Sequence, residues 1–238
     1  MLELKNIYKT FNPGTINEKR ALNGLNLKLN EGDFVTVIGG NGAGKSTMLN
    51  AVAGTWPVDE GQILIDNIDV TKLSEHKRAT YLGRVFQDPM TGTAATMGIE
   101  ENLALAKRRG KSRLLRSGIT KAEREEYKEL LKILGLGLED RLTSKVGLLS
   151  GGQRQALTLL MATLQKPKLL LLDEHTAALD PKTAAKVLEI TDMIVNRDHL
   201  TTLMITHNMK DAIAHGNRLI MMMEGKIILD IQGEEKKK

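Results

Sequence analysis

Two stretches of the sequence combine glycine with residues that can hold an anion. The first, GGNGAGKST at 39–47, places a lysine and a serine directly after its last glycine. The second, LLSGGQRQ at 148–155, has a serine and two glycines but no lysine. Each precedes a segment of helical spacing, and the first turn of a helix carries unpaired N–H groups and a partial positive charge. Both stretches are therefore candidate phosphate-binding sites.

The first stretch has the phosphate-loop spacing G-x-x-x-x-G-K-[ST], with Gly39, Gly44, Lys45 and Ser46 in register. It follows the apolar run FVTVIG and precedes a segment of helical spacing, which is the strand–loop–helix context that the motif requires. We expect Lys45 to span the β- and γ-phosphates of a nucleotide and the Ser46 hydroxyl to bind Mg²⁺. The alternative is a glycine-rich turn with an incidental lysine. The predicted nucleotide-binding residues here are Gly39, Gly40, Asn41, Gly42, Ala43, Gly44, Lys45, Ser46 and Thr47.

Two carboxylates end the apolar run LLLLDE at 169–174. Buried charges must be paired or bind a metal, so the pair indicates a cation at this strand end. Neighbouring strand residues point opposite ways, which gives the two side chains different roles. We assign Asp173 to Mg²⁺, through water, and Glu174 to orienting and deprotonating the attacking water. Otherwise both carboxylates cap the next helix or pair with surface lysines.

Two further polar residues follow candidate strands. Gln87 in VFQDP is placed to contact Mg²⁺ and the attacking water, and His207 in MITHN to contact the γ-phosphate. A lone glutamine or histidine at the end of a strand more often has a structural role than a catalytic one. Ligands of open α/β sheets gather at the carboxyl ends of the parallel strands, however, so the shared position of both residues favours a role in the site.

The elements that position these residues show two kinds of strand pattern. Alternation around Leu2, Leu25 and 62–66 predicts antiparallel strands, whereas the apolar runs FVTVIG, KLLLLD and TLMIT predict parallel strands covered on both faces. Residues 98–165 have helical spacing. The fold class is α/β, a P-loop NTPase core with a mainly parallel sheet, an N-terminal antiparallel β-subdomain and an inserted helical subdomain. The expected parts of this single domain are a core at 1–97 and 166–232, the helical subdomain at 98–165, and a disordered tail at 233–238.

Composition narrows the class further. The chain has 238 residues, no cysteine and a net charge of +5. Its apolar runs are far shorter than the roughly 20 residues that span a bilayer, so any membrane role must come through a partner. Much of the positive charge lies in KRRGKSRLLR at 107–116, which is a solvated face, a nucleic-acid footprint or a lipid-headgroup contact.

The second glycine stretch needs a different partner, because lysine, metal and loop already surround the phosphates of the first. If two copies pack head to tail with two-fold symmetry, the second stretch of one copy can cover the nucleotide of the other. Nucleotide would then favour the closed dimer and hydrolysis would remove that preference. The residues that complete the phosphate shell across this interface are Ser150, Gly151, Gly152 and Gln153.

Taken together, these motifs make the chain similar to the ATP-binding subunit of ABC transporters, most of all those of bacterial importers, over almost its entire length. The matching parts are the Walker A stretch at 39–47, Gln87 of the Q-loop, the LSGGQ signature, the Walker B run at 169–174, the D-loop-like ALD at 178–180 and the switch histidine His207. The resemblance also places Phe11 against the adenine of ATP. His175 and Ala177 depart from the proline and serine frequent in relatives.

The resemblance implies an ATPase that uses ATP and Mg²⁺. An ATP-dependent homodimer would drive a separate integral membrane permease, with an extracytoplasmic substrate-binding protein, to import a small solute such as an amino acid. The subunit would be cytoplasmic, peripheral on the inner face of the cell membrane through the permease, and nucleic acid would not be a partner.

Two other functions are open at this stage. One is a soluble ABC ATPase acting on a macromolecule in cluster assembly, nucleic-acid repair or translation. The single cassette and the absence of sustained heptads argue against it. The other is a nucleotide-binding module without turnover, which the intact Glu174 argues against.

Overall fold

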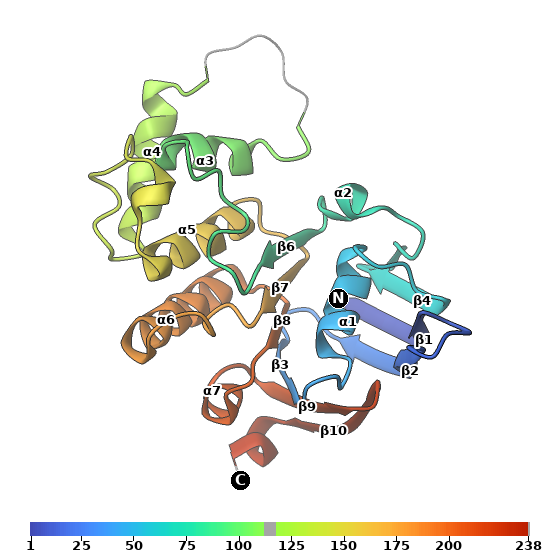
Figure 1. Cartoon of the computed structure of the whole chain (residues 1–238). Helices are drawn as coiled ribbons and strands as arrows, with labels where there is room; N and C mark the ends of the chain where they lie inside the picture. Colours follow the sequence, from blue (N-terminus) through green and yellow to red (C-terminus); the bar gives the residue numbers. More distant parts are fainter. Residues whose placement is uncertain (112–117, 238) are drawn as a thin grey trace. The chain divides into compact units, whose positions relative to one another are not determined.

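A computed structural model describes residues 1–111 and 118–237, and the described residues form two compact units. We call residues 1–84, 167–174 and 195–238 the sheet unit, and residues 85–166 and 175–194 the helical unit. Figure 1 draws both. The predicted limits of the helical subdomain, 98–165, stay a prediction.

An antiparallel sheet of four strands, in the order β2-β1-β4-β5, begins the sheet unit. Its alternating leucines point to one side, and Leu25, Leu27 and Leu29 are buried, as the alternation predicts. The pairing of β1 with β2 brings Phe11 opposite Lys19. The strands are β1 Leu2–Phe11, β2 Lys19–Leu29, β4 Glu60–Ile65 and β5 Ile68–Asp69.

The second sheet has six strands in the order β10-β9-β3-β8-β7-β6. The three apolar runs form its centre, where β3 and β7 each pair with β8 in parallel, so the predicted parallel sheet is confirmed. At one edge β9 pairs with β10 in the antiparallel sense. The strands are β3 Phe34–Gly39, β6 Leu82–Val85, β7 Leu169–Asp173, β8 Thr202–Ile205, β9 Arg218–Met223 and β10 Lys226–Gln232.

Helix α1, Lys45–Ala53, contacts strands of both sheets, and one apolar core joins them. Met48, Leu49 and Val52 of α1 are fully buried in this core. Gly233–Lys237 form the 3₁₀ helix η2, and the Lys236 ammonium donates to the His215 and Gly216 carbonyls. The disorder expected for 233–238 stays a prediction. The other helices of the unit are α2 Glu75–Arg78 and α7 Met209–Ala214.

The helical unit is joined by buried leucines and by one bidentate ion pair. Arg124 of α4 donates to both carboxylate oxygens of Glu100 of α3, at 2.6 and 2.8 Å. Within residues 1–111 and 118–237, no helix combines the length and the apolar character that a membrane span requires. The elements are α3 Ile99–Lys107, α4 Lys121–Lys132, the 3₁₀ helix η1 Val146–Leu148, α5 Gly151–Thr163 and most of α6 Pro181–Asp198.

Candidate nucleotide-binding site

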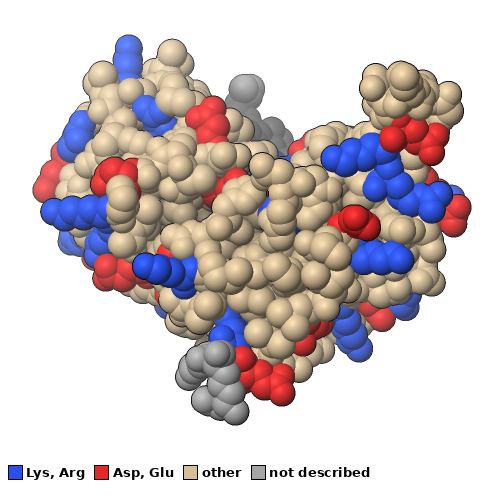
Figure 2. Space-filling view, turned by 60° about the horizontal axis from the view of Figure 1, so that its bottom comes forward, with Lys and Arg blue, Asp and Glu red and all other residues tan. Residues whose placement is uncertain are grey.

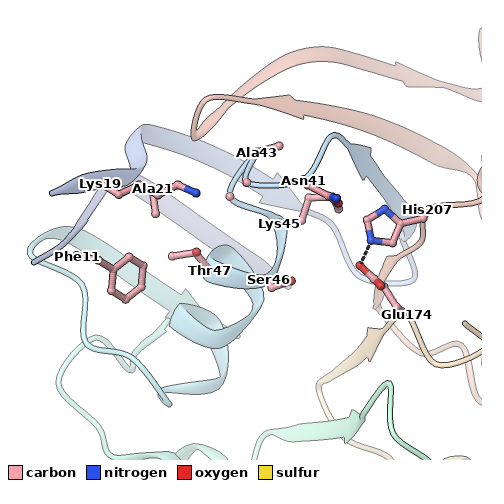
Figure 3. A pocket seen from close by; sticks show the side chains of 12 residues that line it. Phe11, Lys19, Ala21, Asn41, Ala43, Lys45, Ser46, Thr47, Glu174 and His207 are labelled. Atoms are coloured by element: carbon pink, nitrogen blue, oxygen red, sulfur yellow. Dashed lines mark ion pairs between the residues drawn. The ribbon is translucent and has the colours of Figure 1, made fainter. Parts of the chain in front are cut away.

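A cavity of about 220 Å³ lies in the sheet unit, where the phosphate loop meets the ends of several strands. Figure 3 shows an aromatic ring on one side, the loop in the middle and a carboxylate–imidazole pair on the other side. The cavity therefore brings together most of the residues that the sequence assigns to nucleotide binding. Its lining is Phe11, Lys19, Ala21, Asn41, Gly42, Ala43, Gly44, Lys45, Ser46, Thr47, Glu174 and His207.

The start of α1 leaves its backbone donors available. Gly44 precedes the helix with φ of +102° and gives it no side-chain cap. A side chain at Gly44 would come within 2.5 Å of the Ala21 carbonyl oxygen. Glycine is thus required both for the backbone angle and for the close approach of β2. The open N–H groups of this helix start face the cavity and suit a phosphate group.

The lysine of the loop is held by the loop itself. Lys45 is 5% exposed, and its ammonium donates to the carbonyl oxygens of Gly39 at 2.7 Å and Gly40 at 3.2 Å. Gly39 and Gly40 do not line the cavity, so their observed part is to hold this ammonium. A buried cation needs such partners, and phosphate oxygens can replace the carbonyls without leaving the charge unpaired.

Glu174 and His207 form the second polar pair of the cavity. His207 Nε2 lies 2.6 Å from Glu174 Oε1, and the carboxylate is largely buried whereas the ring is half exposed (Figure 3). Glu174 has φ of +48°, a left-handed conformation that is uncommon for a side-chain-bearing residue. Its N–H still donates to the Ile205 carbonyl. Such local strain gathers at functional sites, and here it sets the direction of the carboxylate after β7.

Asp173, the last residue of β7, faces a different partner. Its carboxylate lies 3.5 Å from the Arg84 guanidinium, which also donates to the side chains of Asn50 at 2.7 Å and Thr55 at 3.2 Å. Burial raises the pKa of Asp173, and the positive charges of Arg84 and Lys45 oppose that shift without cancelling it. The two adjacent carboxylates therefore have separate surroundings. Strand alternation does not explain this, because β7 ends at Asp173 and Glu174 follows it with a left-handed φ.

Oxygen donors for Mg²⁺ are present. Ser46 is exposed in the first turn of α1 and lines the cavity, and Asp173 supplies a carboxylate at the end of β7. A hydroxyl and a carboxylate are hard ligands, so Ser46 and Asp173 would suit a magnesium ion. Among the described residues, no three or more His, Cys, Asp or Glu side chains gather into a metal-binding group.

Phe11 ends β1 at the rim of the cavity. Its ring makes an edge contact with Trp56, with centroids 5.0 Å apart, and the Lys9 ammonium lies 5.7 Å from its centroid. Sequence reasoning missed Lys19 and Ala21, which also line the cavity. The register that pairs Phe11 with Lys19 is the signal that would have found them.

Gln87 and the signature residues belong to the helical unit, and their roles at the nucleotide stay predictions. Gln87 is exposed directly after β6, and the Gln155 side chain of α5 holds the preceding backbone through the Phe86 carbonyl at 2.8 Å. Ser150 caps α5 by accepting from the Gln153 N–H at 3.3 Å, and the Gln153 side chain accepts from the Ser150 N–H at 3.2 Å.

The glycines of the signature have distinct surroundings. A side chain at Gly152 would collide with the Thr183 methyl group of α6, so glycine allows the two helices to approach. The same side chain at Gly151 would meet Leu179 at 3.2 Å, which is tight but not forbidden. His175, where relatives often have proline, is buried and lies 3.1 Å from the Thr191 hydroxyl.

Arg154 is a further residue that sequence reasoning missed. It is 5% exposed and donates to the carbonyls of Val146, Gly147 and Leu149, which form the turn before the signature. Arg154 stands between Gln153 and Gln155, so its neighbours gave no sequence signal for this role. A buried guanidinium needs several acceptors, and the carbonyls of the turn supply them.

The basic stretch 107–116 is only partly described, and residues 112–116 lie outside the described residues. Of the described cations, Lys107 pairs with Glu126, and Arg108 pairs with Glu123 at 3.0 Å. Both partners lie on α4, so these two charges are neutralised within the helical unit.

Comparison with known proteins gives a consistent family. Residues 22–177 match the family described as ABC transporter. The chain is 46% identical to the tyrosine transport ATP-binding protein of Clostridioides difficile, over 99% of this chain and 94% of that protein. It is 34% identical to the spermidine/putrescine import ATP-binding protein PotA of Haemophilus influenzae, but there it spans 57% of the relative.

Solved structures agree in fold. The dimeric post-hydrolysis structure of the ATP-binding cassette MJ0796, bound to ADP and Pi, has a TM-score of 0.81 and 32% identity, covering 98% of both chains. The phosphate loop, the Glu174–His207 pair and the signature turn occur in a fold of this type. The chain therefore belongs to the ABC transporter family, as an ATP-hydrolysing subunit.

Proposed function

We propose that the chain powers the import of a small solute through a separate membrane permease, as one copy of an ATP-dependent homodimer. The observation that carries this proposal is the 46% identity, over nearly the whole of both chains, to a tyrosine transport ATP-binding protein. Other relatives are named for the import of methionine, of spermidine and putrescine, and of phosphonates. Amino acids are the solute class that we propose first.

In the proposed hydrolysis, Glu174 accepts a proton from the water that attacks the γ-phosphorus, while the bond from that phosphorus to the β–γ bridging oxygen breaks. ADP and phosphate are the products. His207 donates its Nε2–H to Glu174, at the observed 2.6 Å, and is free to turn toward the γ-phosphate because its ring is half exposed. Lys45 exchanges the Gly39 and Gly40 carbonyls for phosphate oxygens.

We assign the magnesium ion to Ser46 directly, to Asp173 through water and to Gln87 of the Q-loop. When bound, Mg²⁺ neutralises charge that develops on the β- and γ-phosphate oxygens. The protein's own part is to fix the donors: Ser46 on the first turn of α1, and Asp173 beside Arg84 at the end of β7.

For the dimer, we propose that the signature of one copy covers the nucleotide of the other. Ser150, Gly151, Gly152 and Gln153 form the first turn of α5, where N–H groups gather. A relative of similar fold has been solved as a dimer with ADP and Pi, which supports this arrangement. The complex would be held at the cytoplasmic face of the membrane by its permease, with an extracytoplasmic binding protein delivering the solute.

The competing function, a clamp on nucleic acid or another macromolecule, gains no support from Lys107 and Arg108 of the basic stretch, whose charges are paired within the helical unit. On the face shown in Figure 2, basic and acidic side chains are intermixed rather than segregated. A nucleic-acid footprint would need a continuous basic surface.

The test uses Glu174→Gln, which removes the proposed base and keeps the shape of the side chain. With ATP and Mg²⁺ the variant should form a stable dimer, and hydrolysis should fall by about 10²–10⁴-fold. Glu189→Gln, the same change at an exposed site on α6, is the matched control and should hydrolyse ATP normally. Recovery of the tagged variant from detergent-solubilised native membranes should yield a polytopic membrane protein at matched stoichiometry.

That permease, reconstituted with the chain in liposomes, should then accumulate radiolabelled tyrosine or another amino acid when ATP is supplied to the subunit's side. Recovery of only soluble protein or nucleic acid with a demonstrably dimeric variant would contradict the transport proposal. Accumulation of another solute class would replace the amino-acid assignment and leave the ATPase unchanged.

A further inference from the structure

Lys19 is a second lysine in the nucleotide cavity, and neither the phosphate-loop motif nor the hydrolysis described above uses it. It opens β2, directly opposite Phe11 of β1. Lys19 and Ala21 share one face of the strand, and both line the cavity, whereas Arg20 points to the other face. The strand pairing therefore aims Lys19 between the aromatic end of the cavity and the phosphate loop.

The ammonium of Lys19 comes close to the loop. Its Nζ lies 2.9 Å from where a Cβ on Gly42 would stand. Gly42 has φ of +79° and no side chain, so the loop leaves this approach open. Figure 3 shows the Lys19 nitrogen directed from β2 toward the loop, on the Phe11 side of Lys45.

The two lysines of the cavity differ in their partners. Lys45 is buried and held by two carbonyl oxygens. Lys19 is exposed, and among the described residues its ammonium makes no hydrogen bond or ion pair. An unpaired cation at the edge of a cavity that accepts a polyanion has one evident counter-charge, the phosphate groups themselves.

We infer that Lys19 is a phosphate-binding residue, which contacts the oxygens of the nucleotide's phosphates nearer the base and so supplements Lys45. This inference rests on the proposed binding of ATP in the cavity. It distinguishes Lys19 from an ordinary surface lysine, which would stay solvated when nucleotide binds. It also predicts that Lys19 recognises phosphate and not the base.

The experiment measures Kd by calorimetry at low salt for two probes, Mg-ADP and inorganic tripolyphosphate, which has no base. Lys19→Met keeps the length of the side chain and removes its charge. We expect it to raise Kd for both probes by about five- to tenfold, as for the loss of one charge-assisted hydrogen bond. The increase should shrink at high salt, because screening weakens an exposed charge.

Three variants serve as controls. Lys19→Arg should restore both affinities to within about twofold, since it keeps the charge. Arg20→Met removes the neighbouring charge from the opposite face and should leave both affinities near wild type, which separates direct contact from the general field. Phe11→Ala should weaken the binding of Mg-ADP and leave the affinity for tripolyphosphate unchanged. Thermal unfolding of each variant verifies that it is folded.

An unchanged Kd for both probes in Lys19→Met would overturn the inference, and so would weakening of Mg-ADP alone, which would place Lys19 on the sugar or base. Equal weakening by Arg20→Met would also overturn it. Failure of the wild type to bind Mg-ADP would instead refute nucleotide binding in the cavity. If Lys45→Ala lost binding while Lys19→Met bound both probes normally, only the role of Lys19 would be refuted.

Discussion

The two glycine-rich helix starts of the chain solve the problem of unpaired N–H groups in opposite ways. At α1, Gly44 provides no side-chain cap, and the N–H groups face a cavity that already holds a lysine. At α5, Ser150 and Gln153 cap each other's backbone N–H groups, and no lysine follows. The first start is prepared for a phosphate by its own unit, whereas the second satisfies part of its donors itself.

A buried arginine binds backbone carbonyls beside each of these helices, at the last turn of α1 and at the turn that precedes α5. Arg78 is 2% exposed and donates to the Ala51 and Val52 carbonyls at the end of α1, and burial lowers its pKa. Arg154 donates to the turn that leads into the signature. Each arginine adds donors to backbone carbonyls, of which those of Ala51 and Val146 also accept a backbone N–H. Arg154 thus holds the turn that leads into the signature, whereas Arg78 holds the far end of the helix that begins at the phosphate loop.

The largest effect on stability is expected from removing these arginines. Arg154→Met and Arg78→Met should each lower the free energy of unfolding by about 2–4 kcal/mol, because several backbone carbonyls lose a charged donor. The two variants should differ in function: Arg78→Met weakens Mg-ADP binding through α1, whereas Arg154→Met leaves it intact and impairs ATP-dependent dimerisation. Urea unfolding, calorimetry and gel filtration measure these properties.

The binding of Mg-ADP by the two arginine variants can contradict this prediction. If Arg154→Met weakened Mg-ADP binding as much as Arg78→Met does, the two supports would not be independent. Arg20→Met, a change of an exposed arginine, is the control for the loss of charge and should change stability by less than about 0.5 kcal/mol.

An intermediate effect is expected from the glycine contact at α5. Gly152→Ala should destabilise by about 1–3 kcal/mol, because its methyl group meets that of Thr183. Thr183→Ser removes the opposing methyl, so the double variant should regain wild-type stability, helped by the better helix propensity of alanine. If the signature binds nucleotide across the dimer, the double variant should hydrolyse ATP more slowly than the wild type even though its stability is restored. Recovery of both stability and hydrolysis would show that Gly152 serves packing alone.

Sequence reasoning found the parts of the site that depend on local spacing. The strand–loop–helix of residues 34–53 and the parallel strands follow from apolar runs and from the phosphate-loop motif, and the structure agrees. It did not find Lys19 or Trp56, because their place beside Phe11 depends on strand register and on a turn far along the chain. The left-handed φ of Glu174 had no signal in a sequence that carries no glycine there.

The smallest effect is expected at a second capping box, in α4. It sharpens the comparison because its N3 residue, Glu123, is a titratable carboxylate. In α4, Thr120 and Glu123 cap each other as Ser150 and Gln153 do in α5. The Thr120 N–H, with help from Arg108 and against a smaller effect of burial, holds the pKa of Glu123 below its usual value. Because the folded-state pKa is depressed, this stabilisation is present above the unfolded-state pKa and is lost as pH falls through the folded-state value.

Glutamine at N3, as in α5, cannot show this loss. Glu123→Gln should therefore reduce stability by no more than about 0.5 kcal/mol at pH 7, as expected for an exposed charge, and should flatten the acid side of the stability profile. Thermal unfolding from pH 3 to 7 compares the variant with Gln153→Glu, which converts the α5 cap into a titrating one and should steepen the same limb. If stability depended on pH in the same way in both variants and the wild type, the charge of the N3 residue would not distinguish the two caps.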